Sequence, residues 1–377
     1  MLSRVLMIAG EASGDLHGAG VVRALNARRS HVEVFGIGGD AMQREGMELL
    51  YHCSKLSFMG FLEVVRNLTT VLRVERTLLR QLESRRPDVV VLIDYPGFNL
   101  RFAKKVKERG IKVLYYISPQ VWAWNKGRVK AMRQLVDKMM VVFPFEEEIY
   151  RNEGINVEFV GHPIVERIGA SCIRQAFFAR NHLDPLKKLL GIFPGSRVQE
   201  VERILPVMLE AANELRSGRA LQIAIGVAPN LGADLIRRYI PGDAQVTLIE
   251  NATYDLMQYS DAALVTSGTA TLETGWFGTP MVVAYRTSRA SFFIGRLLVD
   301  VPYIGLVNIV AGRKIVPELI QQELTKDAVV KEIAPLLDDP ARANAMRREL
   351  SIIKSRLGGP GASDKVARGI IVLGEVT

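Results

Sequence analysis

Acidic side chains and a histidine gather in the turn that follows the first apolar run of the chain. The stretch IAGEASGDLHG, residues 8–18, carries Glu11, Asp15 and His17 among glycines and leads into a helical pattern. Such a turn usually attracts phosphate, because backbone N–H groups and a helix N-terminus favour anions. Here two carboxylates would repel a phosphate, and both the GxGxxG and the GxxxxGK[ST] spacings are absent. Carboxylates and an imidazole favour hydroxyl groups and proton transfer instead.

A further carboxylate, Asp94, ends the apolar run in VVVLIDYPGFN. Pro96 and Gly97 force a turn directly after it, which places Asp94 at the edge of the predicted sheet where ligands bind. The alternative is that Asp94 only caps the following helix. Because the turn of residues 10–18 should reach the same edge, the residues leave four candidates for a general base: Asp94, Glu11, Asp15 and His17.

Two turns suited to anions occur in the second half of the chain. In IFPGSRVQE, Gly195 lets a ligand approach the backbone, Ser196 can cap a helix, and Arg197 offers a fork of donors suited to phosphate. The alternative is a capped helix with its arginine in water.

The second of these turns lies in ALVTSGTATLE. The small residues Ser267, Gly268 and Thr269 open a helix whose positive end adds to the attraction for an anion. Glu273, about one turn further on, is suited to accept both hydroxyls of a ribose. The alternative is a Ser/Thr cap with Glu273 on the helix surface. Together the two turns and the carboxylate predict binding of a nucleoside diphosphate.

Short β-rich runs alternate with helical patterns, which implies parallel, doubly wound sheets. The predicted strands span residues 5–9, 32–35, 89–93, 113–117 and 138–143 in the first half, and 189–193, 221–225, 246–249, 262–265 and 281–284 in the second. Helices are predicted at 200–216 and 269–277, among others. The pattern restarts near residue 188 after a break at GHPIVERI, residues 161–168. We therefore predict an α/β fold of two Rossmann-like, doubly wound domains, 1–165 and 166–349, facing across a cleft. A C-terminal helix, about 350–377, is expected to pack back onto the first domain.

Composition narrows the classes of protein. The 377 residues carry a net charge of +9, which suits an anionic partner such as nucleic acid, anionic lipid or a phosphorylated substrate. The basic residues are dispersed without a recognised module, so nucleic-acid binding is not expected, and the missing GxGxxG disfavours a dinucleotide-dependent oxidoreductase. No signal peptide or membrane-spanning run is expected, and two distant cysteines favour a reducing compartment. The histidines are scattered, without HExxH or Asp-x-Asp, so we expect neither metal nor cofactor.

The motifs GEASGDLHG, IDYPGFN, SPQVWAWNKGRV, FPFE, VGHP, PGSR, TSGTATLE and LVNIVAGRKIVPE resemble, in this order, the lipid-A-disaccharide synthase family. The resemblance runs from about residue 8 to 318. It implies a glycosyltransferase of the B architecture that transfers 2,3-diacylglucosamine from UDP to the 6-hydroxyl of 2,3-diacylglucosamine 1-phosphate (lipid X). It also implies inversion, metal independence, a β-1,6-linked product, and a peripheral place on the cytoplasmic face of the Gram-negative inner membrane.

The resemblance also assigns roles. The first domain holds the acceptor and faces the membrane, and the second holds UDP-2,3-diacylglucosamine. Asp94 matches the candidate base of the family, with Glu11, Asp15 and His17 as rivals, and Asn308 joins the UDP-binding residues. The alternative is a UDP-sugar epimerase of the same architecture. Whether the chain forms a homodimer is left open.

One segment is suited to contact the anionic lipid surface that such substrates require. KLSFMGFLEVVRNLTTVLRVERTLLR, residues 55–80, combines apolar residues with Arg73, Arg76 and Arg80 on one helical face. The predicted membrane and acyl contacts are Phe58, Met59, Phe61, Leu62 and Arg66. The alternative is an ordinary helix whose apolar stripe faces the core. The second candidate is the segment 288–298, with Arg289, Phe292, Phe293 and Arg296.

Overall fold

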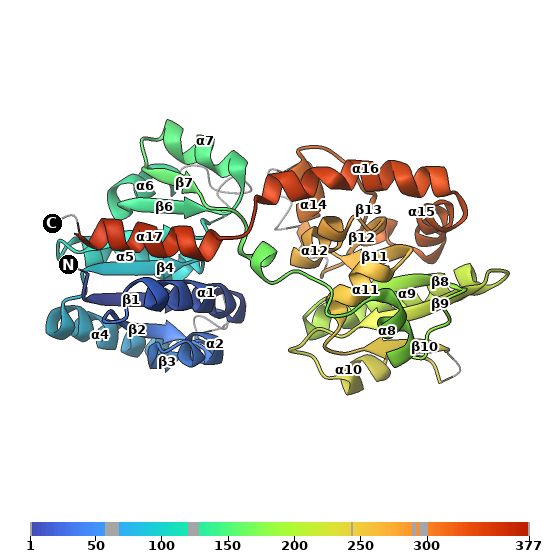
Figure 1. The fold of residues 1–377 in the computed structure, drawn as a ribbon, viewed down its shortest axis with the longest axis horizontal. Helices are drawn as coiled ribbons and strands as arrows, with labels where there is room; N and C mark the ends of the chain where they lie inside the picture. The colour runs from blue at the N-terminus through green and yellow to red at the C-terminus, as the bar shows by residue number, and fades with distance from the viewer. Residues whose placement is uncertain are drawn as a thin grey trace. The chain divides into compact units, whose positions relative to one another are not determined.

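The computed structural model describes residues 2–56, 68–119, 128–242, 244–288, 292–293 and 301–375. It divides into two compact units, Met1–Glu166 with Leu357–Thr377, and Arg167–Arg356 (Figure 1). Each unit contains one parallel β-sheet with helices on both faces. The predicted fold class, two doubly wound α/β domains, is confirmed.

The first unit is built on a seven-stranded sheet of order β3-β2-β1-β4-β5-β6-β7. Its strands are β1 (Arg4–Ala9), β2 (Glu33–Gly38), β3 (Glu48–His52), β4 (Val89–Ile93), β5 (Lys112–Tyr116), β6 (Lys138–Val141) and β7 (Val157–Phe159). Every residue of β4 is buried, as the unbroken apolar run DVVVLID predicts for a strand that helices cover on both faces.

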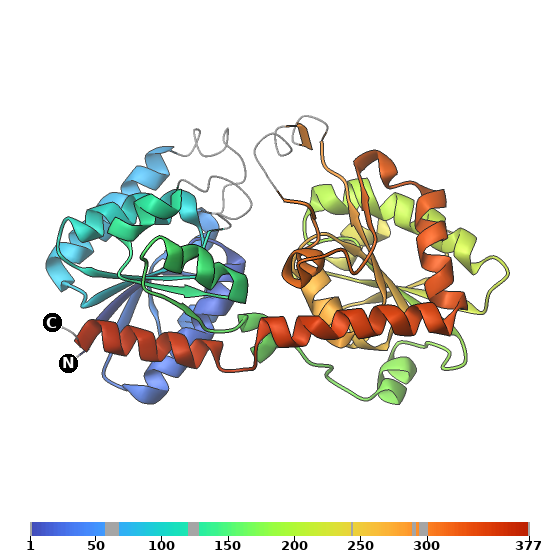
Figure 2. The same ribbon diagram turned by 90° about the horizontal axis from the view of Figure 1, so that it is seen from above.

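Seven α-helices belong to the described part of this unit. They are α1 (Ala12–Arg28), α2 (Asp40–Arg44), α4 (Leu68–Arg85), α5 (Pro96–Lys107), α6 (Arg128–Leu135), α7 (Pro144–Asn152) and α17 (Ala362–Glu375), with short 3₁₀ turns η1 (Cys53–Lys55) and η2 (Pro163–Glu166). The helices α4, α5 and α6 bury their apolar side chains against one face of the sheet. The helices α1 and α17 pack together on the opposite face, and Figure 2 shows α17, in red, across the sheet from α4 and α5. The last helix of the chain thus completes the first unit.

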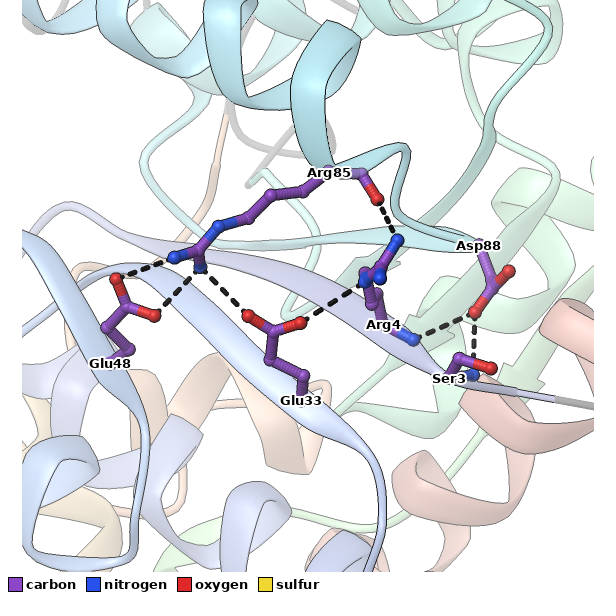
Figure 3. Close-up of polar contacts among 6 residues, drawn as sticks. All are labelled: Ser3, Arg4, Glu33, Glu48, Arg85 and Asp88. Atoms are coloured by element: carbon purple, nitrogen blue, oxygen red, sulfur yellow. Dashed lines mark hydrogen bonds and ion pairs between the residues drawn. The ribbon is translucent and has the colours of Figure 1, made fainter.

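The amino ends of the first four strands are joined by polar contacts (Figure 3). The guanidinium of Arg85 binds the Glu48 carboxylate through two hydrogen bonds of 2.8 and 2.9 Å and pairs with Glu33 at 3.2 Å. Arg4 also contacts Glu33, at 3.2 Å, and donates to the carbonyl of Arg85 at 2.7 Å. Asp88 accepts the backbone N–H groups of Ser3 and Arg4. These contacts tie the end of α4 to β1, β2 and β3, on the sheet edge opposite to the turns that follow the strands.

The second unit has a six-stranded sheet of order β10-β9-β8-β11-β12-β13. Its strands are β8 (Lys188–Phe193), β9 (Leu221–Gly226), β10 (Val246–Ile249), β11 (Ala262–Thr266), β12 (Met281–Tyr285) and β13 (Glu318–Ile320). Its helices are α8 (Arg174–Arg180), α9 (Val198–Arg216), α10 (Ala233–Arg237), α11 (Thr253–Tyr259), α12 (Thr269–Phe277), α14 (Leu306–Ala311), α15 (Lys326–Asp338) and α16 (Pro340–Leu357), with the 3₁₀ turn η3 (Gln321–Glu323). The apolar sides of α9, α10 and α15 form the core on one face of this sheet.

All ten predicted strands are present, with ends that differ by a few residues at most. The sequence analysis missed β3, β7 and β13, which are the outermost strands of their sheets on three of the four edges. Within the described residues, no helix combines the length and the apolar character needed to cross a membrane.

Candidate active site

Strand register brings the two acidic turns of the first unit side by side. Parallel pairing aligns Ala9 of β1 with Ile93 of β4. The residues that follow, Gly10 with Glu11 and Asp94 with Tyr95, therefore leave adjacent strands at the same edge of the sheet, the carboxyl edge at which open α/β sheets bind ligands. The sequence analysis expected this juxtaposition from the order of the elements.

Asp94 has an unusual backbone conformation for its residue type. Its φ is 46° and that of Tyr95 is 49°, so two consecutive residues with β-carbons lie in the left-handed region. The pKa of Asp94 is raised to about 6, first by burial and secondly by the charge of Glu11, whereas the hydrogen bond from the backbone N–H of Tyr95 opposes the shift. A carboxyl with this pKa is ionised at neutral pH and basic enough to take a proton from a hydroxyl.

The ring of Tyr95 lies over the backbone of Gly10. A β-carbon at Gly10 would come within 2.3 Å of the ring atom Cδ1, so only glycine leaves room for this contact. The Tyr95 hydroxyl donates to the carbonyl oxygen of Leu56 at 2.7 Å. Tyr95 thus links the two acidic turns to Leu56, the last described residue before the segment 57–67.

Asp15 is buried and engaged with the backbone of a neighbouring loop. Its carboxylate accepts the N–H groups of Gly39 at 2.7 Å, Ala41 at 3.0 Å and Met42 at 3.0 Å. These are the N–H groups at the start of α2, which a helix itself cannot satisfy. Asp15 therefore anchors α2 to α1, and a role for it as base stays a prediction without support from these contacts.

The two other rivals occupy different surroundings. Glu11 is exposed at the start of α1, and its charge acts on Asp94 and Tyr95. His17 lies six residues later, in α1, where its ring meets that of His162 edge-on at 6.4 Å between centroids. The structure thus couples Glu11 to Asp94 electrostatically and places His17 against the VGHP motif.

In the second unit, register likewise aligns the two anion-suited turns. Val265 of β11 pairs with Phe193 of β8, so the turns at 194–197 and 267–269 leave adjacent parallel strands. This is the arrangement that the prediction of one shared diphosphate site requires. Gly195 and Gly268 have φ values of 108° and 154°, respectively.

The PGSR turn is held by a carboxylate from its own helix. Glu200 accepts the backbone N–H groups of Ser196 at 3.0 Å and Arg197 at 3.3 Å, and it receives the Arg197 guanidinium at 2.9 Å. Asn230 donates its amide N–H to the Ser196 carbonyl at 2.6 Å. The Arg197 side chain remains 60% exposed. The N–H groups of this turn thus already bind a carboxylate, that of Glu200, and the Arg197 side chain is accessible to a ligand.

Glu273 is partly buried beside a tyrosine that the sequence analysis did not identify. The Tyr254 hydroxyl donates to Oε1 of Glu273 at 3.0 Å. Burial raises the pKa of Glu273, whereas the Tyr254 hydrogen bond and the charge of Arg167 lower it. Burial, followed by the charge of Glu273, also raises the pKa of Tyr254, which keeps its hydroxyl protonated as a donor. One carboxylate oxygen is thereby fixed in place, which pre-orients the other.

Asn308 does not present its side chain to a ligand. Its amide is fully buried, donates to the Val316 carbonyl and to Glu318, and accepts the N–H groups of Ile315 and Val316. Glu318 also accepts the N–H groups of Ile304 and Gly305. Direct contact of Asn308 with UDP stays a prediction, but in this structure the residue organises a loop.

That loop borders the SGT turn. The Ser267 hydroxyl donates to the Ile304 carbonyl at 2.9 Å. Thr269 is exposed as the first residue of α12, where the N–H groups of the first helical turn have no intrahelical partner. Asn308 is therefore connected to the SGT turn indirectly. It binds Glu318, which holds the backbone of residues 304–305, and Ser267 binds that backbone.

Several predicted residues lie outside the described part of the chain. These are the membrane and acyl contacts Phe58, Met59, Phe61, Leu62 and Arg66, and also Arg289 and Arg296 of the second candidate segment. Phe293 is described and is 66% exposed. Among the described residues, no group of three or more His, Cys, Asp and Glu side chains is arranged to hold a metal ion.

Comparisons with known proteins agree along the whole chain. A family model described as lipid-A-disaccharide synthetase matches residues 5–363. The lipid-A-disaccharide synthase of Geobacter sulfurreducens is 43% identical over 371 residues, which cover 98% of this chain and 96% of that protein. That of Myxococcus xanthus is 40% identical over 372 residues, covering 98% and 97%, respectively.

Solved structures with low identity share the fold. A UDP-GlcNAc 2-epimerase from Neisseria meningitidis, bound to UDP-GlcNAc, aligns with a TM-score of 0.67 at 15% identity over 98% of this chain and 100% of that one. The calicheamicin glycosyltransferase CalG4 aligns with a TM-score of 0.63 at 15% identity over 100% and 99% of the two chains. Both confirm the two-domain architecture alone, whereas the family model and the relatives establish descent: the chain belongs to the lipid-A-disaccharide synthetase family, whose members are glycosyltransferases of lipid A biosynthesis.

Proposed function

We propose that this chain transfers 2,3-diacylglucosamine from UDP to the 6-hydroxyl of 2,3-diacylglucosamine 1-phosphate (lipid X), with inversion at the sugar carbon. The observation that carries the proposal is the Asp94 carboxyl, whose pKa is raised to about 6 at the carboxyl edge of the first sheet. Family membership supplies the class of reaction, and the residues below supply the chemistry.

In the proposed step, the Asp94 carboxylate accepts the proton of the acceptor 6-hydroxyl. The hydroxyl oxygen forms a bond to C1 of the donor sugar, and the bond from C1 to the diphosphate oxygen breaks. UDP leaves with the electron pair, and the sugar becomes β-1,6-linked to the acceptor. A positioned base contributes about 10²–10⁴-fold to such a step.

The second unit is the proposed UDP site. Arg197 and the N-terminal ends of α9 and α12 meet the charge that develops on the leaving diphosphate. Because Glu200 now accepts the N–H groups of the PGSR turn, a diphosphate that binds them must displace this carboxylate. Glu273, fixed by Tyr254, is the proposed acceptor for the ribose hydroxyls.

We also propose peripheral attachment to an anionic membrane. Both proposed substrates carry long acyl chains, and each methylene transferred from lipid to water costs about 0.8 kcal/mol. The basic side chains Arg73, Arg76 and Arg80 are exposed along α4, directly after the apolar segment 57–67. Exposed basic residues favour anionic lipid by about 1 kcal/mol each.

Chromatography of labelled products tests the reaction. The enzyme is incubated with UDP-2,3-diacylglucosamine alone, lipid X alone, and both together. A tetraacylated disaccharide phosphate and UDP are expected only in the third sample. Conversion of the UDP-sugar without lipid X would instead favour the alternative activity, a UDP-sugar epimerase. This alternative is considered because the Neisseria meningitidis epimerase has the same architecture.

A further inference from the structure

The carbonyl group of Asp94 receives two side-chain hydrogen bonds from the protein interior. The Tyr115 hydroxyl donates to this oxygen at 2.6 Å, and the Asn99 amide donates at 2.7 Å. Asn99 also reaches the carbonyl of Ile93 at 3.3 Å. Two donors from β5 and α5 thus converge on the backbone of one residue at the end of β4.

We propose that Tyr115 and Asn99 are positioning residues that hold Asp94 in its left-handed conformation and so aim its carboxylate at the acceptor hydroxyl. The inference rests on the proposed role of Asp94 as the base. Neither residue is proposed to touch substrate, because both side chains are fully buried.

The backbone needs such support. Two consecutive residues other than glycine, with φ values of 46° and 49°, occupy a sparsely populated region that persists only where the surroundings enforce it. The backbone N–H of Asp94 is bound to the Tyr116 carbonyl at 3.0 Å. With the N–H held by β5 and the carbonyl held by Tyr115 and Asn99, the direction of the Cα–Cβ bond of Asp94 is fixed.

Neither donor loses its proton near neutral pH. Burial, and secondly the charge of Asp94, hold the pKa of Tyr115 well above its usual value, so the hydroxyl stays protonated. The Asn99 amide oxygen is buried with no hydrogen-bond partner among the described residues.

The competing interpretation is that both side chains only satisfy a buried carbonyl and stabilise the core. It predicts a less stable enzyme with unchanged chemistry. The positioning role predicts a change in the rate of transfer and in its pH dependence, because a relaxed Asp94 carboxyl gains solvent and its pKa returns towards the ordinary range.

The test compares Tyr115→Phe with Tyr51→Phe as the matched control. The control removes another partly buried hydroxyl contact in the same unit, between Tyr51 and Thr77 at 3.2 Å. For Tyr115→Phe we expect kcat to fall roughly 10–100-fold, as small misplacements of a reacting group do. The KM for the UDP-sugar and the Kd for UDP should stay within twofold, and the acid limb of the kcat profile should move to lower pH.

Asn99→Ala provides a second route to the same carbonyl if Tyr115→Phe does not fold. Because both donors act on one atom, the fold loss of the double variant should be smaller than the product of the single losses. A folded Tyr115→Phe enzyme with kcat within twofold of the parent and an unmoved acid limb overturns the inference.

Asp94→Asn, assayed in parallel, separates this inference from the proposed function. An inactive Asp94→Asn enzyme beside a Tyr115→Phe enzyme of normal rate overturns the positioning role alone. A fully active Asp94→Asn enzyme overturns the proposed base and the positioning role with it.

Discussion

At the scale of single residues, Asp94 controls the predicted pH dependence of transfer. In the proposed mechanism the Asp94 carboxylate is the active form, and it is populated above its pKa of about 6. We therefore expect kcat to decline below pH 6 and Asp94→Asn to lower it at least 100-fold, within the usual range for a lost base. UDP affinity, measured by isothermal titration, should not change. A near-normal rate for Asp94→Asn would shift the role of base to Glu11 or His17.

The same substitution should make the protein more stable at neutral pH. The folded protein holds the Asp94 proton to about pH 6, above the ordinary value of 3.8, so the free energy of unfolding decreases as pH rises between these values. Above pH 6 the buried charge costs about 2–3 kcal/mol, which an asparagine avoids. Urea unfolding should therefore show a more stable Asp94→Asn variant at pH 7 and little difference near pH 3. Equal stability at pH 7 would contradict the raised pKa.

Tyr254→Phe tests the proposed ribose contact in the second unit. Loss of its hydrogen bond to Glu273 should weaken UDP binding by about 1 kcal/mol, or roughly fivefold, because the carboxylate is no longer fixed. Inhibition by inorganic pyrophosphate, which has no ribose, should stay the same and serves as the control. An equal loss for both ligands would place Glu273 at the diphosphate instead.

The motif residues of the site could be predicted from the sequence, whereas the residues that hold them in position could not. Asp94 and Arg197 stand in turns whose glycines and prolines mark them as sheet-edge positions. Tyr115 lies in an apolar strand, so its sequence context predicts an ordinary core residue. Tyr254 is nineteen residues from Glu273, and no motif connects the two. Contacts between segments distant in sequence leave no local pattern, which is why such partners become visible only in the folded chain.

At the scale of elements, the glycine between β1 and α1 sets the place of Tyr95. In Gly10→Ala the new β-carbon would displace the Tyr95 ring and strain its hydrogen bond to Leu56. We expect a loss of turnover of at least tenfold, since the displaced turn carries Asp94. Gly97→Ala is the matched control, because a β-carbon there meets nothing within 4 Å. Equal rates for the two variants would show that the turn tolerates movement.

The ion pairs at the amino ends of the first strands are predicted to stabilise the fold without affecting catalysis. Arg85→Met removes the bidentate bond to Glu48 and the pair with Glu33 (Figure 3). Because such pairs are partly exposed, the free energy of unfolding should fall by only about 1 kcal/mol, and by less at high salt. The control is Arg80→Met on the same helix, which breaks no ion pair among the described residues. An unchanged melting temperature for Arg85→Met would mean that these contacts add nothing.

The elements that the sequence analysis missed share a physical cause. The strands β3, β7 and β13 have only three to five residues each and lie at sheet edges. None of β3 is fully buried, so its side chains follow neither the apolar run of a central strand nor a regular alternation. Central strands such as β4 can be recognised from the apolar run that their burial requires. An edge strand is specified mainly by pairing with its neighbour, which leaves no such pattern.

At the scale of the whole molecule, the proposed acyl substrates require a route from the membrane to the enzyme. The acyl chains of such substrates rarely leave the bilayer, so little free lipid is available in water. We therefore expect the enzyme to bind at the membrane surface. Residues 57–67 supply the apolar component of the predicted contact, and α4 supplies exposed Arg73, Arg76 and Arg80. On α4 itself the apolar stripe of Val71, Val74, Leu78 and Leu82 faces the core, whereas Leu72 is 39% exposed. Insertion is therefore proposed for the preceding segment, with Leu72 as a further apolar contact.

Phe58→Ser/Phe61→Ser therefore tests the membrane proposal at two aromatic residues of the predicted lipid contact. The variant should remain folded, because the helix that follows keeps its own core contacts. It should no longer sediment with anionic liposomes, and it should process membrane-borne substrate poorly while retaining its rate on detergent-dispersed substrate. Phe292→Ser/Phe293→Ser is the matched comparison, since Phe293 is 66% exposed in the other candidate segment. If the first variant binds liposomes like the parent and the second does not, the lipid contact belongs to residues 288–298, and the arginines of α4 serve only to attract the anionic surface.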